Sequence, residues 1–133
     1  MLKRPGLMAA LWCCAALVQA QAPDKAPDRV PAPFVGTWKV TWEGKSRPLT
    51  AEMVLTESGG HWQTFNVGSK TNSCSGRTVP IAVKSASADA VALQLRFSEV
   101  INGCDNVSVK LQRGADGAIT GTRSGEPLTL VKQ

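Results

Sequence analysis

Few side chains in this sequence could perform acid–base or nucleophilic chemistry. His61 is the only histidine, and it directly follows a Gly-Gly pair that is typical of a turn. A serine nucleophile needs a base and an acid that orients this base, and no serine here has such partners. Glu52, Glu57 and Glu99 would form a catalytic carboxylate pair only by coincidence of folding. We therefore expect an exposed His61 and a protein that is not an enzyme.

Metal binding has equally little support in the sequence. Turn positions, where side chains bond to nearby backbone, hold several oxygen-bearing residues: Asp89, Asp105, Asn106 and Asp116. Their spacing is not that of a calcium loop, and no histidine lies near any cysteine. We expect no metal and no cofactor.

The beginning of the chain resembles an export signal. The basic pair Lys3-Arg4 is followed by an apolar stretch from Leu7 to Val18, and Val18-Gln19-Ala20 has the small residues of a cleavage site. The apolar stretch is too short to span a bilayer. We expect residues 1–20 to be removed and the mature protein to be periplasmic or secreted, without a transmembrane anchor.

Two cysteines, Cys74 and Cys104, lie beyond the predicted signal. A pair of cysteines in an exported chain indicates a disulfide. In the chain-entropy model, closing a loop of this length stabilises the fold by about 3–4 kcal/mol. We therefore predict one disulfide between Cys74 and Cys104.

The charge of the mature chain is modest. Without Lys3 and Arg4, 13 lysines and arginines face 10 acidic residues, so the net charge falls from +5 to +3. The basic residues are scattered and are not interleaved with aromatic residues, which gives no support for nucleic-acid binding.

A linker separates the signal from the folded part. Residues 21–33 are rich in alanine and proline and have little to bury, so we expect a disordered segment. We expect residues 34–133 to form a single domain.

That domain alternates apolar and polar residues with a period of two, which is typical of strands with one buried face. We expect no helix and eight strands: residues 37–43, 49–56, 61–67, 78–86, 90–97, 106–112, 118–123 and 128–132. Glu57–Gly60 would form a turn, and Pro80 would lie at a bulge or near a strand start. Eight antiparallel strands in sequence favour an all-β, up-and-down barrel, which leaves no exposed sheet edge. In such a barrel Cys74 and Cys104 lie in loops at the same rim.

The first strand contains a short motif, Phe34-Val35-Gly36-Thr37-Trp38-Lys39. It resembles the opening strand of the calycin superfamily, which includes lipocalins, fatty-acid-binding proteins and avidins. The resemblance implies that Trp38 closes one end of the barrel. Fatty-acid-binding proteins place helices between their first two strands, and only five residues separate those strands here.

Avidins are similar in size, strand number and loop length. Their biotin contacts include an asparagine and a serine that correspond to Val40 and Gly44 here, and a tyrosine, which this chain lacks. The avidin-like resemblance therefore implies a barrel but no biotin binding.

The aromatic and apolar residues suggest two functions. The first is a lipocalin-like barrel that binds a small apolar or amphipathic ligand at one mouth. Arg77 or Arg96 would be the charge partner of this ligand. The wall of the predicted site consists of Trp38, Trp42, Met53, Trp62 and Phe97. The second is a filled barrel that binds a protein, for example an enzyme that it inhibits, through loops 68–76 and 98–106. Small outward residues, such as Ala82, Ala92 and Thr120, would also suit a homo-oligomer.

Overall fold

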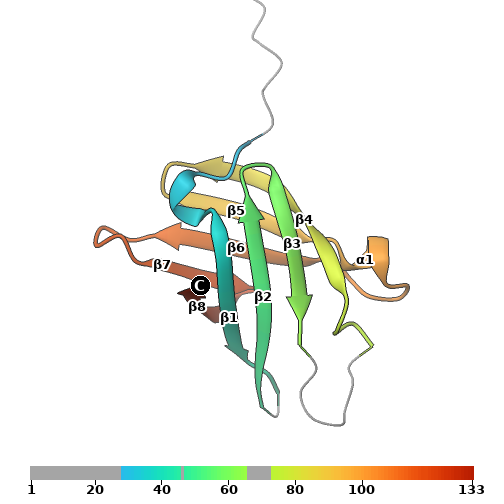
Figure 1. Ribbon diagram of the computed structural model, residues 1–133. Helices are drawn as coiled ribbons and strands as arrows, with labels where there is room; N and C mark the ends of the chain where they lie inside the picture. Colours follow the sequence, from blue (N-terminus) through green and yellow to red (C-terminus); the bar gives the residue numbers. More distant parts are fainter. Residues whose placement is uncertain (1–27, 46, 66–72) are drawn as a thin grey trace, which may run out of the picture.

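The computed structural model of the protein describes residues 28–45, 47–65 and 73–133 (Figure 1). Its eight antiparallel strands are hydrogen-bonded in sequence order, and β8 returns to β1 to close a barrel. The strands are β1 (Gly36–Glu43), β2 (Pro48–Thr56), β3 (Gly59–Thr64), β4 (Thr78–Ser87), β5 (Ala90–Leu95), β6 (Val107–Arg113), β7 (Ile119–Arg123) and β8 (Glu126–Lys132). The predicted fold class is confirmed.

The described residues also include two short helical segments. The 3-10 turn η1 (Ala32–Phe34) precedes β1, and the helix α1 (Phe97–Val100) connects β5 to β6. The prediction of no helix and of a fifth strand that extends to residue 97 is wrong. Leu95 is the last residue of β5 with a partner in β6, and Phe97 then turns inward and is buried over the barrel end. Burial of this ring outweighs the alternating pattern.

The β2–β3 hairpin is tighter than the sequence suggested. The predicted turn covered residues 57–60, but Gly59 and Gly60 already pair with β2. Both have φ near +140°, a conformation that suits glycine. A Cβ atom on Gly60 would overlap the carbonyl oxygen of Val54, so the close approach of β2 and β3 requires glycine here.

An irregularity in β4 changes which residues face the interior. Val79 and Ile81 are buried as the alternation predicts, but the register shifts between Val83 and Ser85. Beyond this bulge Ala86 packs against the core. Pro80 lies near the start of the strand, opposite an exposed His61, as expected.

One end of the barrel is closed by the segment before β1. The indole Nε1 of Trp38 donates to the carbonyl oxygen of Phe34 at 2.9 Å, and both rings are buried. Val30, which belongs to the predicted linker, is also buried, and its amide donates to the carbonyl of Glu57. The ammonium of Lys132 lies 5.6 Å from the centre of the Trp38 ring. Trp38 thus has a closing role, which the calycin resemblance implied.

Replacing Trp38 with phenylalanine tests this closure. We expect Trp38→Phe to lower the free energy of unfolding by about 1–2 kcal/mol, because the buried Phe34 carbonyl loses its donor. Chemical denaturation measures the change, and the neighbouring exposed Lys39→Ala serves as the control. Equal stabilities of the wild type and Trp38→Phe would contradict the closing role.

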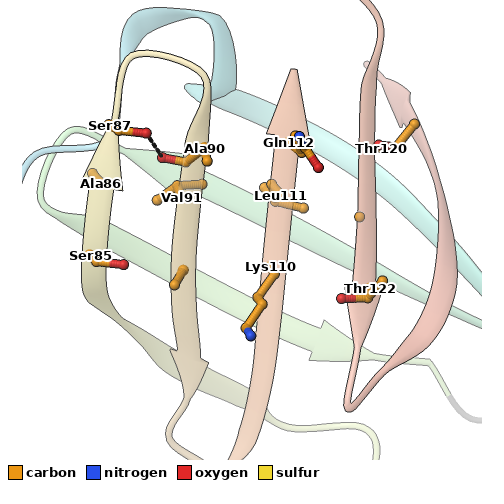
Figure 2. Close-up of a pocket in the computed structure, with 12 residues that line it drawn as sticks. Ser85, Ala86, Ser87, Ala90, Val91, Lys110, Leu111, Gln112, Thr120 and Thr122 are labelled. Atoms are coloured by element: carbon orange, nitrogen blue, oxygen red, sulfur yellow. Dashed lines mark hydrogen bonds between the residues drawn. The ribbon is translucent and has the colours of Figure 1, made fainter. Parts of the chain in front are cut away.

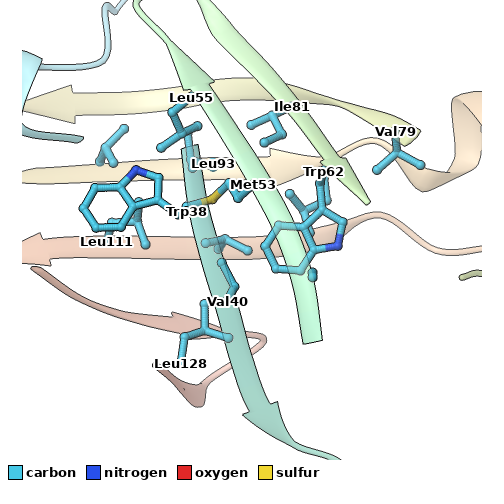
Figure 3. Close-up of a cluster of buried hydrophobic side chains, with 14 of the residues drawn as sticks. Trp38, Val40, Met53, Leu55, Trp62, Val79, Ile81, Leu93, Leu111 and Leu128 are labelled. Atoms are coloured by element: carbon cyan, nitrogen blue, oxygen red, sulfur yellow. The ribbon is translucent and has the colours of Figure 1, made fainter. Parts of the chain in front are cut away.

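The middle of the barrel is filled by side chains. Trp62, Met53 and Leu93 are fully buried there, and Figure 3 shows Met53 between Trp38 and Trp62. A side chain at Gly121 would meet Leu111, so glycine leaves room for the leucine that fills this part of the interior. Any ligand must therefore bind at an end of the barrel or on its outside.

Candidate functional site

A hollow of about 170 Å³ lies at the barrel end opposite to Trp38. We call it the mouth pocket, and it is lined by Trp42, Leu49, Thr64, Cys74, Ser75, Phe97, Asp105, Val107 and Arg123. Consecutive strands of the barrel are antiparallel. The ends of β1, β3, β5 and β7 therefore meet here with the starts of β2, β4, β6 and β8. Apolar side chains form most of its wall.

The rim of the mouth pocket is held by a disulfide and several hydrogen bonds. Cys74 and Cys104 are bonded, with their Cα atoms 5.9 Å apart, which confirms the predicted pairing at one rim. Arg77 Nη1 donates to the carbonyl oxygen of Val100 at 3.1 Å. The Ser98 hydroxyl and the Asn106 amide oxygen are 2.8 Å apart. These contacts fix the β5–β6 loop, which carries Phe97.

Trp42 lines the mouth pocket and packs against Trp62, which lies behind it in the core. The rings of Trp42 and Trp62 are tilted by 42°, and their centres are 5.6 Å apart, a favourable geometry for aromatic pairs. Trp62 Nε1 donates to the Thr64 hydroxyl at 2.8 Å. Trp62 is fully buried and satisfied, so Trp42, which lines the pocket, is the ring that a ligand would contact.

Arg123 brings a positive charge into this apolar wall. It is the last residue of β7 and lies opposite the buried Val109, so its side chain is on the inner face of the barrel. Its guanidinium carbon is 4.8 Å from the centre of the Trp42 ring. Burial lowers the pKa of Arg123 below its usual value, and its Nε is buried without a hydrogen-bond partner.

The five predicted wall residues are distributed along the barrel. Trp42 and Phe97 line the mouth pocket, and Trp62 lies beside Trp42. Met53 is in the filled middle, and Trp38 is at the closed end. The structure therefore brings three of the five together and separates the other two from them.

Arg123 lines the mouth pocket and was not among the predicted site residues. The two arginines considered as charge partners do not line the mouth pocket: Arg77 binds the Val100 carbonyl, and Arg96 precedes α1. The signal for Arg123 was the period of two in the seventh strand, which puts it on the same face as Ile119 and Gly121. An arginine on an inward face stands out once this alternation is followed.

A larger hollow of about 520 Å³ lies on the outside of the barrel across β4–β7 (Figure 2). We call it the outer hollow. Small or polar side chains face it, including Ser85, Ala92, Lys110 and Thr122, with the last three in register on neighbouring strands. Among the small outward residues predicted for an oligomer surface, Ala92 and Thr120 lie here.

The structure describes one of the two predicted partner-binding loops in full and the other in part. Of the loop 68–76, residues 68–72 lie outside the described residues, while 73–76 and the loop 98–106 are at the rim of the mouth pocket. In the described ranges, no three His, Cys, Asp or Glu side chains gather as they would around a metal. None of the helices in those ranges is long and apolar enough to cross a membrane.

No protein-family model, curated protein or solved structure matches the chain. The class that the structure defines is an eight-stranded antiparallel closed barrel with one disulfide.

Proposed function

We propose that this protein is an exported, non-enzymatic binding protein of the calycin type. Its mouth pocket would hold a small apolar or amphipathic ligand. The observation that carries the proposal is the position of Trp42, whose ring lines a hollow at the open end of an otherwise filled barrel. The disulfide suits an oxidising compartment and supports export.

The size of the pocket limits the ligand. Drug-sized ligands occupy pockets of about 300–1,000 Å³, whereas the mouth pocket measures about 170 Å³. Met53 and Trp62 are fully buried beneath it and leave no deeper path. A single aromatic or branched aliphatic group is the largest body that fits.

The rim supports binding because it is already in place. The disulfide and the Arg77 contact with Val100 join the described segments 73–77 and 98–106 of the rim, and the Ser98 contact with Asn106 lies within the second segment. A preformed site loses little conformational entropy when a ligand enters. The apolar wall then contributes free energy in proportion to the area that it covers.

Replacing Trp42 with leucine tests the proposed site. We expect the wild type to bind the neutral probe 2-phenylethanol, and Trp42→Leu to weaken this binding about tenfold by removing the ring face, a loss of about 1.4 kcal/mol. Titration calorimetry or NMR measures the affinity. Trp38→Phe, at the closed end, is the control and should bind as the wild type does. Equal binding by Trp42→Leu would contradict the site.

The filled interior also supports a second proposal, a protein partner that contacts the rim of the mouth. The described rim segments, residues 73–76 and 98–106, are joined by the disulfide and would form one contact surface. A barrel of this kind should not respond to 2-phenylethanol, so the same titration separates the two proposals. A homo-oligomer through the outer hollow would be detected as a multiple of the chain mass in native mass spectrometry.

A further inference from the structure

We propose that the ligand of the mouth pocket is a small apolar carboxylic acid whose carboxylate is held by Arg123. This inference rests on the proposed function and names the chemical class of its ligand. It follows from the position of one guanidinium, from the absence of a pairing acid among the described residues, and from the character of the surrounding wall.

The position of Arg123 is set from two sides. The β7 register puts its side chain on the inner face, opposite Val109, and the Trp42 ring lies 4.8 Å from its guanidinium carbon. The ring faces the guanidinium in a cation–π contact, and the Nε donor of Arg123 has no hydrogen-bond partner. Arg123 and Trp42 both line the mouth pocket, so a ligand could contact them together.

No acid in the described part of the chain neutralises this charge. Asp105 is on the same rim and Glu126 is opposite Arg123 in the β7–β8 ladder, yet neither forms an ion pair with it. Arg29 forms an ion pair with Glu57 that is well exposed and does not involve Arg123. The Nε of Arg123 is buried and unpartnered. A half-buried cation without a counterion is costly, and an anionic ligand would remove that cost.

The wall selects the kind of anion. A guanidinium matches the two oxygens of a carboxylate or of a phosphate. Leu49, Phe97 and Val107 surround the charge with apolar surface, and Asp105 adds a negative charge at the rim. Asp105 would repel a doubly charged phosphate more strongly than a singly charged carboxylate, and Arg123 is the cation among the described residues that line the pocket. A singly charged carboxylate with an apolar body fits both the charge and the volume of the pocket.

A pair of probes with the same shape tests this inference. Phenylacetate and phenylacetamide differ in charge at the group that would face Arg123. We expect the wild type to bind phenylacetate at least tenfold more tightly than phenylacetamide. We expect Arg123→Met to lose this preference while still binding the amide, and Arg123→Lys to keep part of it. Arg113→Met, which removes an exposed arginine outside the mouth pocket, is the matched control and should keep the full preference.

Each result of these titrations has a defined meaning. Equal affinities of the wild type for acid and amide would overturn the inference and leave the proposed function standing. A preference for the acid that survives in Arg123→Met would also overturn it, because another cation would then hold the carboxylate. Binding of neither probe would overturn the proposed function together with the inference. An unchanged melting temperature of Arg123→Met would show that the variant is folded.

Discussion

Replacing Trp62 with alanine is expected to lower the free energy of unfolding by about 3–5 kcal/mol, the range for a large buried aromatic residue. Trp62 is fully buried, contacts Trp42 and donates to the Thr64 hydroxyl. The substitution would therefore leave a cavity in the core and an unpaired buried hydroxyl. The barrel cannot collapse readily around this cavity, because its wall is a continuous hydrogen-bonded sheet.

Chemical denaturation of Trp62→Ala measures this loss. His61→Ala is the matched control, since His61 is the preceding residue on the same strand and faces solvent. We expect the control to stay within about 0.5 kcal/mol of the wild type. A loss below about 1 kcal/mol for Trp62→Ala would mean that the core is not packed around this residue as the structure shows.

Removing the disulfide is expected to have an effect of similar size. The Cys74→Ala/Cys104→Ala double variant opens a loop of sequence separation 30. The added freedom of the unfolded chain lowers stability by about 3–4 kcal/mol in the chain-entropy model. We also expect weaker binding at the mouth pocket, because Cys74 is in its wall.

The effect on stability is measured by thermal or chemical unfolding of the double variant. Reduction of the wild type with dithiothreitol is a useful parallel, since it breaks the same bond without a substitution. The two treatments should give the same loss. Unfolding of the double variant at the wild-type midpoint would contradict the expected stabilisation by the disulfide.

Most of the barrel could be predicted from the sequence because its walls obey one simple rule. Strands with one buried face alternate every second residue, and short turns join them in order. The meander then brings Cys74 and Cys104 to one rim without further assumption, and the structure confirms that pair. These features depend on local pattern and connectivity, which a sequence contains directly.

The departures from the prediction occur where tertiary contacts override the local pattern. Phe97 continues the alternation of the fifth strand, yet it is in α1 because its ring is buried over the barrel end. Gly59 and Gly60 look like a turn, yet they are in β3 because the neighbouring backbone comes too close for a side chain. Neither contact can be read from neighbouring residues alone.

The candidate site was only partly predictable for a geometric reason. Trp38 and Trp42 share a face of β1, so the pattern groups them together. Four residues of strand span about 13 Å, however, which separates the two rings along the barrel axis. Trp38 therefore closes one end, while Trp42 lines the other with Arg123.

The most direct test of the proposed binding site follows the indole N–H signals of the protein by NMR during a titration with phenylacetate. Trp42 lines the mouth pocket, Trp62 lies beside it, and Trp38 is at the closed end. We expect the Trp42 signal to move most, the Trp62 signal to follow it, and the Trp38 signal to stay in place. Movement of the Trp38 signal alone, or of none of the three, would contradict a ligand site at the mouth of this barrel.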